Sequence, residues 1–181
     1  FVDNETGTAP ISIRGDSLCH VTITDCYIVG NRSGTSFSAI DVDGDWRNTH
    51  FPDTRRKPIV TVKGTVIADN SGFWPGAVGA GDADVAIINC TITGNRSHNP
   101  FSSMTIGEDD QPVNHALTTT GITQATVFNS ILWNNGGPEK FNSTTSVQYS
   151  DIMGGWDNAG NIDTDPLFVD PTSGDYSLQY G

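Results

Sequence analysis

The chain has 181 residues, and its 21 acidic and 9 basic side chains give it a formal net charge of -12 at pH 7. Asp accounts for 18 of the acidic residues, and there are 21 Thr, 20 Gly and 14 Asn. These residue types favour strands, turns and positive φ, whereas Lys and Glu, which favour helices, are scarce. The composition therefore excludes an all-helical protein, and the charge argues against a basic nucleic-acid-binding protein. No apolar run approaches the roughly 20 residues of a membrane-spanning helix.

Five related segments recur along the chain, and each predicts two short strands joined at a bend. In the first segment, VTITDCYIVGN, apolar residues alternate with polar ones on both sides of Asp25, and the segment ends at Asn31. Alternation with a period of two is typical of a half-buried strand. The segments start at Val21, Val60, Val85, Ala125 and Val147, with bends at Asp25, Gly64, Asn89, Asn129 and Asp151.

A third apolar strand is expected after each of these units, at 40–42, 78–80 and 104–106, with 11–13 in the same role before the first unit. Three short strands per turn, repeated over about five rungs, predict a parallel β-solenoid in which equivalent residues stack. Asparagines at one turn are then expected to form a hydrogen-bonded amide ladder. The predicted ladder consists of Asn31, Asn70, Asn95 and Asn135. A second predicted column, which points inward, consists of Cys26, Thr65, Cys90 and Ser130.

The units NCTITGN and NSILWNN resemble right-handed parallel β-helix proteins of the pectate-lyase-like superfamily. The stretch 147–179 is similar to the carboxyl-terminal end of the β-helix region in bacterial secreted and surface proteins with variable anchors. The resemblance implies an all-β fold, a right-handed parallel β-helix, as one domain over 1–181 with a cap-like segment at about 154–181. It also implies an extracellular or cell-surface location. It implies no particular activity, because this fold carries enzymes, adhesins and inert stalks.

The connections that follow the third strands leave the solenoid at one corner, where acidic residues collect. Oxygen ligands at alternate positions in DVDGD resemble the start of a calcium loop, so Asp41, Asp43 and Asp45 are the sharpest calcium candidates. The alternative is a solvated acidic rim that keeps the protein soluble. The rest of the possible acidic-edge site consists of Asp82, Asp84, Glu108, Asp109 and Asp110.

An apolar strip is expected on an outward flank, and such a strip is usually covered. The cover could be the chain's own loop 73–75, a stacked sugar or another protein. The expected strip consists of Tyr27, Val66, Phe128, Ile131 and Trp133, and the freest N-glycosylation sequons are those of Asn4 and Asn142.

These features predict an extracellular structural, adhesive or glycan-binding element. Subunits could associate laterally or stack head to tail into fibres, because a short solenoid exposes unpaired strands at its ends. The alternative is an enzyme, a calcium-assisted polysaccharide lyase or a glycoside hydrolase acting along the acidic corner. The sequence singles out no catalytic residue.

Overall fold

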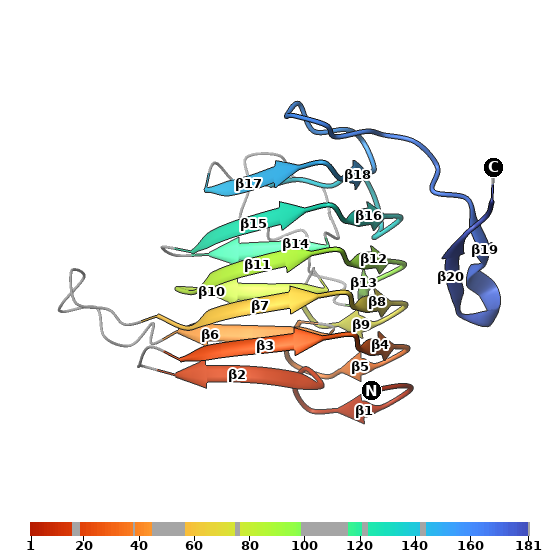
Figure 1. Ribbon diagram of the computed structural model, residues 1–181. Coiled ribbons are helices and arrows are strands. Elements are labelled where there is room, and N and C mark those ends of the chain that lie inside the picture. Colours follow the sequence, from red (N-terminus) through yellow and green to blue (C-terminus); the bar gives the residue numbers. More distant parts are fainter. Residues whose placement is uncertain are drawn as a thin grey trace.

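The computed structural model describes residues 1–15, 19–37, 39–44, 57–74, 77–98, 116–120, 123–141 and 144–180. The described chain is almost entirely strands and turns, and four parallel sheets stack strand upon strand in a solenoid-like arrangement (Figure 1). The first sheet contains β2 (Ile11–Gly15), β6 (Ile40–Gly44), β10 (Val78–Gly81) and β14 (Leu117–Thr120). The second contains β3 (His20–Thr24), β7 (Ile59–Lys63), β11 (Asp84–Ile88), β15 (Gln124–Phe128) and β17 (Thr145–Gln148).

The third and fourth sheets have shorter strands. The fourth was not expected from the sequence, since only three strands per turn were predicted. The third contains β4 (Tyr27–Val29), β8 (Val66–Ala68), β12 (Thr91–Thr93), β16 (Ile131–Trp133) and β18 (Asp151–Ile152). The fourth contains β1 (Glu5–Thr6), β5 (Arg32–Ser33), β9 (Ser71–Gly72) and β13 (Arg96–Ser97), which directly follow the ladder asparagines.

The core consists of inward residues that stack from strand to strand. Ile67 pairs with Ile28 on one side and with Ile92 on the other, and all three are fully buried. Alternation along each strand directs these side chains inward and their neighbours outward. Sequence periodicity therefore placed the core correctly in the first four units.

The predicted Asn ladder is confirmed and is longer than expected. From Asn4 to Asn95, each Asn donates from its backbone N and from Nδ2 to Oδ1 of the next Asn, at 2.8 to 3.1 Å. The residue before each ladder Asn has a positive φ, between 51° and 68°. These preceding residues are Asp3, Gly30, Asp69, Gly94 and Asn134, types that tolerate the left-handed conformation.

The bend between the second and third sheets forms another column of positive φ, and here one prediction is wrong. The last unit starts at Thr145, which pairs with Ala125, so that Val147 pairs with Val127. Tyr149 (φ 51°) therefore occupies the bend, and Asp151 is buried in β18. A slip of two residues keeps every side chain on its face, so alternation could not reveal it.

The predicted third strand at 104–106 lies outside the described residues, and its expected place is occupied by β14. Leu117 pairs with Val78, and Thr119 pairs with Ala80. Leu117–Thr120, which follows the predicted 104–106 strand in the sequence, is therefore the strand that extends the first sheet.

The two ends of the stack differ. At the amino-terminal end, β2 and β3 each pair with a single strand, and Ile11, Ile13 and Val21 are only partly buried. At the other end, Ile162 bridges to Asp151, and the rings of Phe141 and Trp156 pack edge to face at 5.1 Å beside the core. Because one end is partly covered, the geometry does not favour head-to-tail stacking over other associations, and fibre formation stays a prediction.

Candidate functional site

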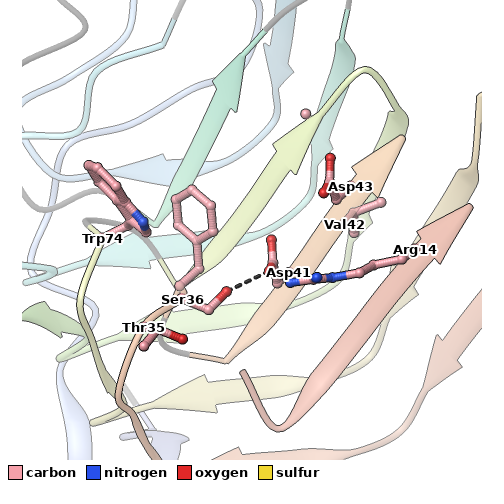
Figure 2. Close-up of a pocket in the computed structure, with 9 residues that line it drawn as sticks. Arg14, Thr35, Ser36, Asp41, Val42, Asp43 and Trp74 are labelled. Atoms are coloured by element: carbon pink, nitrogen blue, oxygen red, sulfur yellow. Dashed lines mark hydrogen bonds and ion pairs between the residues drawn. The ribbon is translucent and has the colours of Figure 1, made fainter. Parts of the chain in front are cut away.

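A groove of about 240 Å³ lies on the outer surface of the first sheet (Figure 2). Side chains of β2 and β6 form one side, and the turns after β5 and β9 form the other. Gly79 of β10 leaves room for the Phe37 ring, which lies directly over it, because a Cβ at this position would collide with the ring. The groove is lined by Arg14, Thr35, Ser36, Phe37, Asp41, Val42, Asp43, Trp74 and Gly81.

Two backbone hydrogen bonds position Trp74 at this groove. The Phe73 and Trp74 nitrogens both donate to the Ser36 carbonyl oxygen, at 2.9 and 3.3 Å. The Phe73 ring then supports the Trp74 ring edge to face, at 5.5 Å between centroids. The indole is nevertheless 44% exposed, so a rigidly held aromatic side chain remains open to a ligand.

The charged groups of the groove come from registered positions on neighbouring strands. Arg14 pairs with Asp43 across β2 and β6, and alternation along each strand directs both side chains to the outer face of the sheet. The Asp41 carboxylate accepts a hydrogen bond from Ser36 Oγ and lies 3.6 Å from Arg14 Nη2. The Arg14 side chain is 61% exposed, so this ion pair is weak and the guanidinium can contact a ligand as well.

The predicted calcium candidates are thus divided. Asp41 and Asp43 line the groove, whereas Asp45 lies outside the described residues. Within the described ranges, no group of three or more His, Cys, Asp or Glu side chains is arranged to hold a metal ion. Calcium binding at this motif stays a prediction.

The rest of the predicted acidic edge is only partly described. Asp82 has a φ of 47° and follows β10, and Asp84 begins β11. The Asp84 carboxylate lies 2.5 Å from Lys57 Nζ, so this part of the edge holds a compensating cation. Glu108, Asp109 and Asp110 lie outside the described residues.

The predicted apolar strip is interrupted and partly exposed. Thr91 stands between Val66 and Ile131 in the outward column of the third sheet. Tyr27 is 56% exposed and Phe128 is 40% exposed. The remaining members, Val66, Ile131 and Trp133, are half-buried.

A carboxyl-terminal hairpin lies at this flank, on the side of β4, β8, β12 and β16 (Figure 1). Its strands, β19 (Phe168–Asp170) and β20 (Asp175–Leu178), are antiparallel. The buried Tyr176 hydroxyl donates to the Asp69 carboxylate, and burial and this hydrogen bond raise the pKa of Tyr176 well above its ordinary value. Of the loop 73–75, expected as the chain's own cover, Trp74 lines the groove, and Pro75 lies outside the described residues.

We expect Tyr176→Phe to loosen this hairpin while the stack stays folded, because the variant loses the bond to Asp69 but keeps the buried ring. Loss of a hydrogen bond to a charged group corresponds to about 1.5–3 kcal/mol. Hydrogen exchange of the β19 and β20 amides should accelerate, while exchange in β11 stays unchanged. Tyr180→Phe, at a fully exposed tyrosine, is the matched control. Equal acceleration in both variants would contradict the role of Tyr176 as the anchor that holds the hairpin through Asp69.

The Asn ladder ends at a buried carboxylate that the sequence analysis missed. Glu139 Oε1 accepts from Asn135 Nδ2 at 2.8 Å, and Oε2 accepts from the Ala116 nitrogen at 2.7 Å. Burial raises the pKa of Glu139 from 4.5 to about 7, although the hydrogen bonds from Ala116 and Asn135 oppose this shift. Glu139 thus accepts from Asn135 Nδ2, as Oδ1 of a further ladder Asn would.

Sequence reasoning also missed Arg14, Ser36 and Trp74 as groove residues. A signal existed for Arg14, because the alignment of 11–13 with 40–42 places it beside Asp43. None existed for Ser36 and Trp74, which lie on turns outside the repeat. Of the two predicted sequons, Asn4 is at the ladder end, with Nδ2 2.8 Å from Asn31 Oδ1, and Asn142 lies outside the described residues.

Comparisons with known proteins found no matching family model, no matching curated protein and no matching solved structure. In the part of the chain that the structure describes, no helix is long and apolar enough to cross a membrane.

Proposed function

We propose that this chain is a right-handed parallel β-helix of the pectate-lyase-like type that acts outside the cell or at its surface and binds glycans in the groove. The stacked parallel sheets and the Asn ladder support the fold part of this proposal. The groove supports the binding part, and calcium could assist there through the Asp41 and Asp43 carboxylates.

The observation that carries the proposal is the exposed Trp74 ring beside charged and hydroxyl groups. A sugar ring offers an apolar face and a rim of hydroxyl groups. An aromatic side chain supplies large contact area at low entropic loss, and carboxylates, guanidinium groups and hydroxyls accept from or donate to the rim. Arg14 and Asp43 provide the guanidinium and the carboxylate of this groove, and the exposed Thr35 provides a hydroxyl oxygen.

The proposal predicts that Trp74→Ala weakens glycan binding at least tenfold, as expected for a central aromatic contact. The measurement is affinity electrophoresis or calorimetry against a panel of soluble polysaccharides. Phe128→Ala is the matched comparison, because Phe128 is similarly exposed (40%) but belongs to the predicted apolar strip. The groove predicts loss of binding with Trp74→Ala and wild-type binding with Phe128→Ala.

Loss of binding with Phe128→Ala and wild-type binding with Trp74→Ala would indicate that the glycan binds at the apolar strip. That result would contradict the groove as the binding site. Binding of no polysaccharide on the panel would contradict the glycan-binding proposal. Circular dichroism of each variant checks that the fold is retained, which is expected because both side chains lie outside the core.

The enzymatic alternative uses the same groove, where Asp41 and Asp43 lie on one face of β6. Two carboxylates flanking a sugar are the groups that glycoside hydrolysis requires, and carboxylates with calcium could assist a lyase. Incubating the same panel with and without calcium distinguishes these activities from binding. Release of reducing or unsaturated sugars that is lost in Asp43→Asn would favour an enzyme.

A further inference from the structure

The short fourth sheet carries two arginines on one outward column. Arg32 of β5 and Arg96 of β13 both pair with Ser71 of β9, which lies between them. Both arginines are exposed, and none of the three side chains makes a hydrogen bond or ion pair within the described residues. Two unpaired guanidinium groups on one column stand out in a chain with a net charge of -12.

The spacing lets both guanidinium groups reach the space above Ser71. Neighbouring strands are about 4.8 Å apart, so the two arginine backbones lie roughly 10 Å apart with Ser71 midway. An arginine side chain is long and flexible enough to bend toward the middle from either side. The column therefore offers two planar forks and one hydroxyl as donors around a single point.

The environment of His98 indicates that the Arg32 charge acts across β9. His98 follows Arg96 by two residues, so alternation places both side chains on the same face of the fourth sheet. Burial, and secondarily the positive charge of Arg32, lower the pKa of His98. Arg32 lies on β5, whereas His98 follows Arg96 of β13. The Arg32 charge therefore acts across β9 on the strand that carries Arg96.

We propose that Arg32, Ser71 and Arg96 form a cradle for a tetrahedral oxyanion, the sulfate or phosphate ester of a polymer. A planar carboxylate has two oxygens, which one guanidinium fork already satisfies. A tetrahedral oxyanion has further oxygens and can accept from both forks and from the hydroxyl. Glu5, on the other side of Arg32 in the column, makes no ion pair with it and disfavours an anion there, which directs the anion to the Ser71 side.

This cradle shares no residue with the groove, so it stands or fails independently of the proposed function. The first test is calorimetric titration of the chain with inorganic sulfate, inorganic phosphate and acetate. We expect saturable binding of sulfate or phosphate, with acetate at least tenfold weaker. Arg32→Gln and Arg96→Gln should each lower the affinity at least tenfold, as loss of a hydrogen bond to a charged group predicts.

Two further variants separate the cradle from general electrostatics. Lys63→Gln removes one positive charge from an exposed side chain of β7 and should leave the affinity unchanged. Arg96→Lys keeps the charge but removes the fork and should weaken binding. No saturable binding, equal affinity for acetate, an equal loss in Lys63→Gln, or wild-type affinity in Arg96→Lys would each overturn the cradle.

Polymers then distinguish the two possible esters. Retention by dextran sulfate in preference to uncharged dextran identifies a sulfate ester, and retention by phosphorylated dextran identifies a phosphate ester. Equal retention by all three polymers would contradict the proposal.

Discussion

We expect Asn95→Ala to lower the free energy of unfolding by about 3 kcal/mol or more, because it leaves several buried polar groups without partners. Asn95 Nδ2 donates to the Ile67 carbonyl oxygen and to Asn135 Oδ1, at 2.9 and 3.0 Å. Asn95 Oδ1 accepts from the backbone nitrogen and from Nδ2 of Asn70, at 3.1 and 2.9 Å. Urea denaturation measures the loss.

Two comparisons make this expectation specific to the ladder. Asn158→Ala, at an exposed Asn whose Oδ1 accepts from the next backbone nitrogen, should change stability by no more than about 1 kcal/mol. Asn4→Ala should have an intermediate effect, because Asn4 is exposed at the ladder end and bonds to Asn31 alone within the ladder. Equal losses in all three variants would show that the ladder contributes nothing beyond ordinary hydrogen bonding.

The second large effect is a pH dependence that arises from Glu139. The folded state holds the pKa of this buried carboxyl at about 7, against 4.5 for the ordinary group. The unfolded state therefore releases its proton first as the pH rises. Stability from this group is complete below pH 4.5, falls between these two pKa values and is lost above about pH 7.

The difference between the two pKa values corresponds to about 3 kcal/mol. Glu139→Gln cannot ionise, so the loss of stability between pH 4.5 and pH 7 should be smaller in this variant than in the wild-type chain. Its absolute stability should be lower at acid pH, because the Gln amide presents N–H groups to the Ala116 or Asn135 donor. The measurement is urea denaturation at a series of pH values.

Glu5→Gln is the control for Glu139, since Glu5 is an exposed Glu on β1. Its pH profile should follow the wild type. The informative quantity is the difference between each variant and the wild type, because other groups also titrate in this range: burial raises the pKa of Asp151, and burial lowers that of His98. A Glu139→Gln profile parallel to the wild type would contradict a buried, ionising Glu139.

Much of the fold could be predicted because the repeat is local. Each unit carries its own alternation and its own left-handed residue before the Asn, as in Gly30-Asn31 and Gly94-Asn95. Stacking such units places equivalent residues together without any long-range information. The ladder and the register of the first four units follow from that pattern.

The last unit shows where periodicity stops being informative. A register shift of two residues leaves the inward and outward sets unchanged, so Val147 could be aligned with Ala125 or with Val127. The bonds around the bend decide between them. Ser150 Oγ accepts from the Ser130 nitrogen at 3.1 Å, and Asn161 Oδ1 accepts from the Ser150 nitrogen at 3.0 Å.

The amino-acid sequence thus determined the two strands of each of the first four units, the inward column and the Asn ladder, since burial alternation acts residue by residue. Only the tertiary structure decided the groove, the Glu139 end of the ladder, the Tyr176 anchor and the Arg32–Arg96 column. Tyr176 meets Asp69 across 107 residues, and Trp74 meets Ser36 through backbone atoms of two turns. Each of these two contacts involves at least one residue outside the repeat, so it depends on the path of turns and loops in space, which no periodic pattern specifies.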